Sequence, residues 1–176
     1  SRSANLNTES LLVVCILSRS GQLLMGKSFK KMSEGDRRKR QRNLFRTMRN
    51  LQWDIHKFED LNARQLHDIL KLRQDVFIIE QDCMYTDIDG NDPHALHLIG
   101  YQEHQLIAYA RIFEPGKKYT EASVGRIVIG ADARNLGLGK VLVKRANDYC
   151  DRMYSNEGIR IEAQAHLIGF YSELGY

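Results

Sequence analysis

A short glycine-containing turn has the residue types of a phosphate-binding site. It reads Arg134-Asn135-Leu136-Gly137-Leu138-Gly139. Its two glycines carry no Cβ atom, so the backbone there can approach a pyrophosphate closely. Free N–H groups in the first turn of a helix, together with the helix dipole, bind anions. Arg134 adds a cation at the mouth, so the turn is a candidate pyrophosphate site.

The elements on either side suit this role. Residues 124–129 are apolar and β-branched, as in a buried strand. After the turn, apolar side chains recur at the three- and four-residue steps of a helix, at Leu138, Val141, Leu142, Ala146, Tyr149 and Cys150. An ordinary strand-to-helix connection can carry the same glycines. The third glycine of the dinucleotide-binding pattern and the Gly-Lys-Ser/Thr of the P-loop are both missing, so the turn belongs to neither class.

The remaining pattern predicts an α/β fold, a mixed sheet with helices on its faces. Asn62, with Gln65 three residues later, is a good N-cap for a helix. A short helix is expected over residues 167–174. We expect strands at residues 11–17, 22–29, 51–55, 95–101, 106–113, 124–129 and 159–163.

Charge divides the chain into two parts. The 176 residues have a net charge of +4, but residues 1–49 hold twelve Lys and Arg against three Asp and Glu, a net charge of +9. We therefore expect a basic N-terminal extension, residues 1–50, and one domain over residues 51–176. Nucleic-acid binding through residues 27–49 is one interpretation of this charge, and a solvated helix or linker is the one we favour.

Cysteine usage and hydropathy predict a cytoplasmic protein. The three cysteines are far apart in the sequence, which favours reduced thiols. The longest apolar run, residues 11–17, is too short to span a bilayer. Four aspartates occur within residues 82–92, but their spacing does not fit a calcium-binding EF-hand loop. We expect an acidic surface loop there and no bound metal.

Several segments resemble the ElaA-like family of GNAT N-acetyltransferases over about residues 51–176. The matching segments are Val76-Phe77-Ile78-Ile79-Glu80-Gln81, Tyr85-x-Asp87-x-Asp89-Gly90-x-Asp92, Ala108-Tyr109-Ala110-Arg111, Gly125-Arg126-Ile127-Val128 and Ala163-Gln164-Ala165-His166-Leu167 with Phe170-Tyr171. The resemblance implies the GNAT acyl-CoA N-acyltransferase fold. That family normally adds one or two strands after the last helix seen here. Either the sequence is truncated at this point, or the apolar N-terminal hairpin fills the vacant edge of the sheet.

The resemblance also implies where acetyl-CoA binds. Backbone groups of residues 127–129 are expected to pair with the pantetheine arm, and residues 134–140 to hold the pyrophosphate. Gln164 stands where many relatives have asparagine, and Asn135 replaces a glycine, which reduces backbone freedom. The implied coenzyme-binding residues are Ile127, Val128, Ile129, Arg134, Asn135, Leu136, Gly137, Leu138, Gly139, Lys140 and Gln164.

The implied reaction is direct transfer of an acetyl group to a small or peptidic primary amine in a ternary complex. Tyr171 stands where the family keeps a tyrosine beside the coenzyme sulfur, and its phenol can protonate the leaving thiolate. The amine must lose a proton, and Glu80, Glu162 and His166 are the candidate bases. We rank Glu80 first, because an apolar helix end would raise its pKa.

The acceptor side is expected at the acidic loop. Its residues are Tyr85, Asp87, Asp89 and Asp92. An acidic rim would attract a cationic amine. The alternative to an enzyme is a non-catalytic coenzyme A-binding module that is recruited through the basic extension. The sequence leaves the oligomeric state open.

Overall fold

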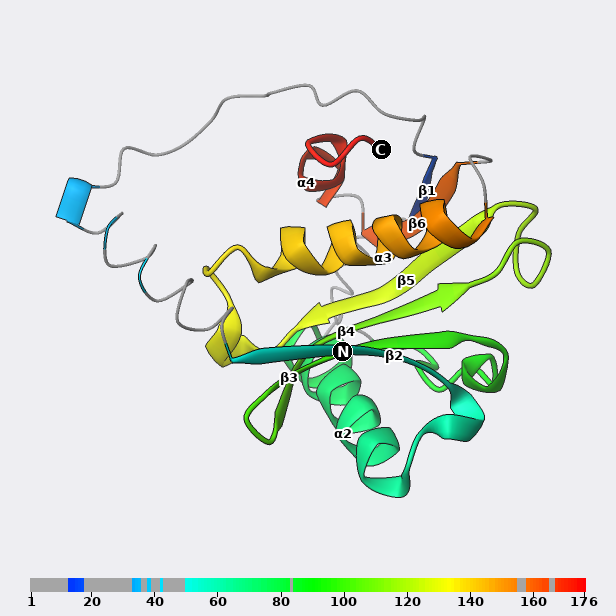
Figure 1. Cartoon of the computed structure of the whole chain (residues 1–176), viewed down its shortest axis with the longest axis horizontal. Coiled ribbons are helices and arrows are strands. Elements are labelled where there is room, and N and C mark those ends of the chain that lie inside the picture. The colour runs from blue at the N-terminus through cyan, green and yellow to red at the C-terminus, as the bar shows by residue number, and fades with distance from the viewer. Residues whose placement is uncertain are drawn as a thin grey trace, which may run out of the picture.

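A computed structural model describes residues 13–17, 33–35, 38, 42, 50–82, 84–154, 158–164 and 167–176. Its centre is a six-stranded sheet in the order β1-β6-β5-β4-β3-β2 (Figure 1). The strands are β1 (Val13–Leu17), β2 (Leu51–Lys57), β3 (Leu96–Gln102), β4 (Gln105–Phe113), β5 (Ala122–Ile129) and β6 (Ile159–Gln164). Neighbours are antiparallel except for β5 and β6, which are parallel. The predicted mixed sheet is thus confirmed.

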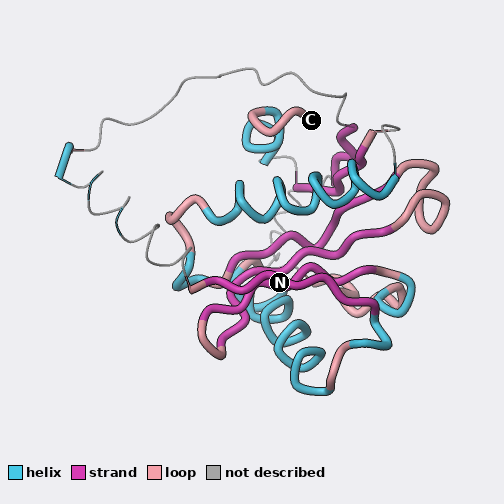
Figure 2. Tube along the Cα trace, in the orientation of Figure 1, coloured by secondary structure: helices cyan, strands magenta, loops and turns pink. Residues whose placement is uncertain are grey.

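Helices cover both faces of this sheet. Helix α2 (Ala63–Arg73) lies on one side, and α3 (Leu138–Tyr154) and α4 (Ile168–Ser172) lie on the other (Figures 1 and 2). A π-helix, Gln74–Glu80, continues α2. Short 3-10 turns are found at Phe58–Asp60, Asp92–His94 and Ala131–Ala133.

Helix α2 begins where the sequence predicts. The side chain of Asn62 accepts a hydrogen bond from the backbone N–H of Gln65, and the Gln65 side chain accepts one from the N–H of Asn62. This reciprocal capping box satisfies two backbone donors that the helix itself leaves unpaired. Apolar residues continue at helical steps through Phe77 in the sequence, but the chain changes to π-helical bonding after Arg73. The sequence pattern does not separate the two helix types because the apolar steps are similar in both.

The core has two layers, because successive side chains of a strand point to opposite faces. On the α3 side, Leu142, Val143 and Ala146 pack with Ala110 and Ile112 of β4. On the α2 side the cluster comprises Ile69, Leu72, Val76, Ile99, Leu106, Tyr109 and Val128. The central strand β4 is therefore buried on both faces, as its nearly continuous apolar sequence predicts.

An N-terminal strand completes one edge of the sheet. Residues of β1 pair antiparallel with β6, from Val13 opposite Gln164 to Leu17 opposite Arg160. Strand β1 therefore lies at the edge of the sheet beside β6. The expected return strand, residues 22–29, lies outside the described residues.

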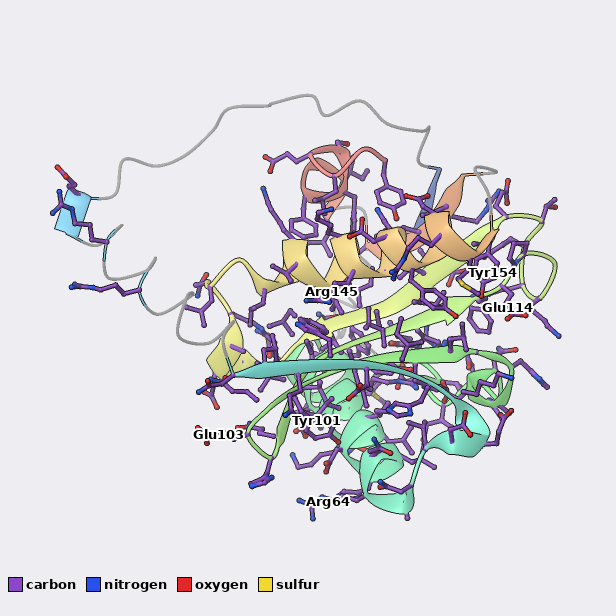
Figure 3. The ribbon with its side chains drawn as sticks, in the orientation of Figure 1. Arg64, Tyr101, Glu103, Glu114, Arg145 and Tyr154 are labelled. Atoms are coloured by element: carbon purple, nitrogen blue, oxygen red, sulfur yellow. The ribbon has the colours of Figure 1, made fainter. Side chains whose placement is uncertain are left out.

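A tryptophan near the other edge is held between a glycine and an arginine. The ring of Trp53 in β2 lies over Gly100 of β3, its register partner. Arg145 extends from α3 toward the sheet (Figure 3), and its guanidinium carbon is 5.1 Å from the centroid of the Trp53 ring. A Cβ atom at Gly100 would lie 2.8 Å from Trp53 Cζ3 and 3.1 Å from the Cβ of Ala108. Glycine at position 100 therefore makes room for the indole.

We predict that Gly100→Ala destabilises the fold. The added methyl group overpacks a filled site, which typically costs about 1–3 kcal/mol. Urea unfolding measures the free energy of unfolding. Gly169→Ala is the matched control, because nothing lies within 4 Å of the Cβ position there, and it should be neutral or slightly stabilising. Equal stability of the two variants would contradict this account of Trp53.

Candidate active site

The glycine-containing turn leads directly into α3, as predicted. Asn135 has φ of +61° and Gly137 has φ of +78°. Asparagine is one of the few residues other than glycine that adopt this left-handed conformation readily, so the turn keeps its shape without a glycine at 135. No atom lies within 4 Å of a Cβ built at Gly137, whereas one built at Gly139 would lie 3.4 Å from Phe170 Cζ. Gly137 thus leaves open space, and Gly139 accommodates α4.

The side chain of Arg134 is already bound to two acceptors. Its Nη1 and Nη2 donate to the two carboxylate oxygens of Glu80, the Nη2 bond being 2.7 Å, and its Nε donates to the carbonyl oxygen of Ile129 at 3.1 Å. The hydrogen bonds from Arg134 lower the pKa of Glu80. The expected rise in this pKa is therefore wrong. The apolar helix end does not bury the carboxylate, whose side chain is 45% exposed and bound to a cation.

Strands β5 and β6 separate beside this turn. They pair only from Ala122 opposite Ile159 to Val124 opposite Ile161. Beyond Val124, β5 pairs with β4 alone among the described strands. The edge of residues 127–129 that faces β6 thus has no strand partner among the described residues. A cavity of about 280 Å³ lies there, lined by Phe77, Gln81, Tyr85, Arg126, Ile127, Glu162, Ala163, Gln164, Leu167 and Tyr171.

The predicted residues Tyr171 and Gln164 meet at this cavity. Tyr171 is buried, and desolvation raises the pKa of its phenol to about 12. It therefore remains protonated at neutral pH. Phe170 and Tyr176 pack edge-on against its ring, with centroids 5.0 and 6.1 Å away. The amide of Gln164 donates to Gln81 Oε1 at 2.9 Å, which links β6 to the end of the π-helix.

The candidate bases differ in their relation to the cavity. Glu162 lines it and accepts hydrogen bonds from Tyr119 and, at 2.7 Å, from Lys118. Burial acts to raise the pKa of Glu162, but these hydrogen bonds outweigh burial, and the pKa is lowered. Glu80 is not among the lining residues. His166 lies outside the described residues.

The aspartates of the predicted acidic rim are bound to arginines instead. Arg73 Nε and Nη1 lie 2.8 Å from Asp87 and Asp92 respectively. Arg111 is 2.6 Å from Asp89 and 2.8 Å from Asp92. Arg126 closes the network, 2.6 Å from Asp87 and 3.3 Å from Asp89. Each carboxylate thus bridges two guanidinium groups in a closed, alternating ring.

This arginine–aspartate ring changes the expected electrostatics. Its six charges balance, and Asp87, Asp92, Arg73 and Arg111 are buried. Burial acts to raise the pKa of Asp89 and Asp92, but the arginines outweigh it, and both pKa values are lowered. The expectation of an acidic rim that attracts a cation is therefore wrong for these three aspartates. Only Tyr85 of the four predicted acceptor-side residues lines the cavity; its hydroxyl donates to Asp87 at 3.1 Å.

Sequence reasoning missed the three arginines as partners of the loop. A signal was present, because Arg73 lies on the apolar face of a helix and Arg111 and Arg126 lie within apolar strands. Buried arginines require acceptors. The aspartate-rich loop is the richest source of acceptors in the sequence. Among the described residues no group of three metal-ligating side chains could hold a metal ion.

We predict that Asp89→Asn destabilises the protein at neutral pH and weakens the pH dependence of its stability. Breaking this partly buried network should cost roughly 2–4 kcal/mol, slightly less than for fully buried pairs. Because the folded pKa of Asp89 is lowered, its contribution is complete above its unfolded pKa of about 3.9 and is lost as the pH falls further. Asparagine cannot be protonated, so the variant should lose less stability in that range.

Urea unfolding from pH 7 to pH 2.5 measures both effects. Asp75→Asn is the control, since it removes the same charge from an exposed ion pair with Lys71. That variant should change stability by at most about 1 kcal/mol. A wild-type acid dependence retained in Asp89→Asn would contradict the assignment.

Comparison with known proteins agrees with this geometry. A 39% identical protein of Synechocystis, a UPF0039 protein, aligns over 127 residues, which are 72% of this chain and 82% of the relative. Protein ElaA of Escherichia coli is 33% identical over 129 residues, 72% of this chain and 84% of ElaA.

Two crystal structures have similar folds at a TM-score of 0.67. One is an acyl-CoA N-acyltransferase from Pseudomonas aeruginosa, 34% identical, aligned over 71% of this chain and 87% of that one. The other is Escherichia coli ElaA, 31% identical, aligned over 70% of this chain and 85% of that one.

No helix in the described ranges is long and apolar enough to cross a membrane.

The sequence model of the acetyltransferase (GNAT) family matches residues 48–176, most of the chain. The separated strands β5 and β6 and the glycine-containing turn lie within these residues. The chain therefore belongs to the acetyltransferase (GNAT) family.

Proposed function

We propose that this protein is an N-acetyltransferase that moves the acetyl group of acetyl-CoA to a primary amine, by direct attack in a ternary complex. The observation that carries the proposal is the cavity between β5 and β6, where the protonated phenol of Tyr171 meets an unpaired strand edge. The ElaA-like relatives and the acyl-CoA N-acyltransferase neighbour support it.

The described residues fit an acyl-coenzyme A. Residues 127–129 offer backbone groups on an edge that no described strand occupies, which suits an extended amide-containing arm. The turn from Arg134 to Lys140 offers N–H groups at the start of α3, and the space above Gly137 is open. In this proposal the pyrophosphate lies at the turn, and the thioester lies in the cavity beside Tyr171.

Acetyl-CoA supplies a thioester whose carbonyl carbon accepts an amine and whose sulfur leaves as a thiolate. A backbone N–H in residues 127–129 polarises the carbonyl oxygen. Tyr171 donates its proton to the sulfur as the C–S bond breaks, and burial keeps this proton in place until then. Glu162, directly or through water, accepts the proton that the attacking amine loses, since it lines the cavity and Glu80, the other candidate base in the described residues, does not.

We predict that Tyr171→Phe lowers kcat by at least about tenfold, because general-acid assistance is typically worth roughly 10²- to 10⁴-fold. Phenylalanine keeps the ring and its edge-on packing, so the fold and the Kd for acetyl-CoA should change little. Steady-state kinetics with an amine panel and calorimetry with acetyl-CoA measure the two quantities. Unchanged turnover would show that Tyr171 only packs. Binding of acetyl-CoA by the wild type without transfer to any amine would favour the non-catalytic coenzyme-binding module.

A second prediction concerns Glu80. If this carboxylate neutralises Arg134 rather than acting as the base, Glu80→Gln should free the guanidinium for the pyrophosphate and leave kcat nearly unchanged. Exposed ion pairs are worth about 0–1 kcal/mol, so the Kd for acetyl-CoA should fall by at most about fivefold. Calorimetry measures this, and Glu59→Gln, an exposed acid elsewhere, controls for net charge. A kcat reduced a hundredfold or more would instead identify Glu80 as the base.

A further inference from the structure

Exposed apolar side chains gather on the segment that borders the cavity. Six large apolar or aromatic side chains are exposed in the described part of the chain, and four of them lie within residues 79–88. They are Ile79, Met84, Tyr85 and Ile88, which are 69%, 90%, 37% and 62% exposed. Single exposed apolar residues are ordinary, but a group of them beside a cavity indicates a contact surface. We name these four residues the apolar rim.

The apolar rim is continuous with the cavity through the chain itself. Phe77, Gln81 and Tyr85 line the cavity, and Ile79 and Met84 lie between them or next to them in the sequence. Within the cavity, Ile127, Ala163 and Leu167 add apolar surface on the far side. The cavity therefore has apolar lining groups, and the other three residues of the apolar rim lie within four residues of a lining residue in the sequence.

The charges of the same region are already matched. Asp87 and Asp89 lie beside the apolar rim in the sequence, but the arginine–aspartate ring binds both of them. Glu162, the carboxylate within the cavity, is bound to Lys118 and Tyr119. Asp82 is exposed and has no ion pair with another described residue, so it is the one carboxylate of the segment that could attract a cation. If the acceptor amine carried a second ammonium group, that group would lose its bound water on entering this region and would gain no buried counter-ion.

From these observations we infer the acceptor class: a primary amine carried on an alkyl or aryl group, with the apolar rim holding that group. This inference rests on the function proposed above and narrows it. A polyamine or another multiply charged acceptor is disfavoured by the same geometry, because Asp87, Asp89 and Asp92 are bound to arginines. The rim acts on specificity, so its effect is expected in kcat/KM for the amine and not in the affinity for acetyl-CoA.

Hexylamine and cadaverine test the inference directly. The two have the same number of non-hydrogen atoms and differ in one end, a methyl group in hexylamine and an ammonium in cadaverine. With the full chain and saturating acetyl-CoA, kcat/KM for hexylamine should exceed that for cadaverine by at least about fivefold. The joint variant Met84→Ser with Ile88→Ser should lower kcat/KM for hexylamine about three- to tenfold. Its KM for acetyl-CoA and its kcat/KM for cadaverine should change less than about twofold.

Two controls match these variants. Met153→Ser removes an exposed methionine from α3, away from residues 79–88, and should leave the ratio of the two amines unchanged. Asp82→Asn removes the exposed carboxylate and should also leave the ratio unchanged. A ratio that moves with Asp82→Asn would overturn the inference, because the segment would then recognise charge.

Other outcomes would also overturn it. Equal use of the two amines, or a preference for cadaverine, would leave the acetyltransferase in place and refute the acceptor class. An unchanged ratio in the serine variants, together with a shift from dimer to monomer in light scattering, would show that the apolar rim joins two copies of the chain. Transfer to neither amine nor to any other amine tested would refute the proposed function itself, and the inference with it.

Discussion

The arginine–aspartate ring is the interaction on which the arrangement of the site depends. Arg73 comes from α2, Arg111 from β4 and Arg126 from β5, and all three aspartates come from one loop. Arg73 and Arg111 are buried and Arg126 is partly buried. They could not be so without counter-charges, because each unpaired buried ion would carry a desolvation cost of several kcal/mol. The loop that holds the three aspartates must therefore lie over the sheet next to these arginines. The ring thereby also fixes where the other residues of the loop lie.

The ring also determines the shape of β5. Arg126 has φ of +51°, which is unusual for a residue with a side chain, and it lies where the pairing of β5 with β4 changes register. Asp87 holds its guanidinium on the α2 side, while the Tyr85 ring lies 5.2 Å from the guanidinium carbon. Beyond this irregularity β5 no longer pairs with β6, and the cavity occupies the gap. One polar cluster thus supports both the cavity and the loop that borders it.

A second ion pair changes the expected roles of two charged residues of opposite sign. Glu80 and Arg134 were expected to serve as base and phosphate ligand, and the structure joins them. Both are partly exposed, so the ion pair contributes little to stability. Glu162 in turn lies in the cavity but is held by Lys118 and Tyr119. Glu80 and Glu162 thus differ in the cations and hydroxyl groups that they bind, and this difference cannot be read from their positions in the sequence.

The sequence alone predicted the features that involve only residues close to one another along the chain. The capping box of Asn62 and Gln65, the β3–β4 hairpin and the turn from Arg134 to Gly139 are local, so residue type and spacing determine them. Tyr171 and Gln164 both line one cavity, and their roles there stay predictions. The residues that form each of these local features are close in sequence. The expected fold into which the elements pack came from the resemblance to a family.

The pairing of charges was decided by the tertiary structure. Asp87 meets Arg126 across 39 residues, and Glu80 meets Arg134 across 54. A carboxylate on a loop has the same sequence signature whether it faces solvent or a buried arginine, so the acidic rim and the raised pKa of Glu80 were both reasonable and both wrong. The edge position of β1 beside β6 depends in the same way on a distant partner. Local preferences specify the elements, whereas the requirement that buried charges find partners is met only when the whole chain has folded.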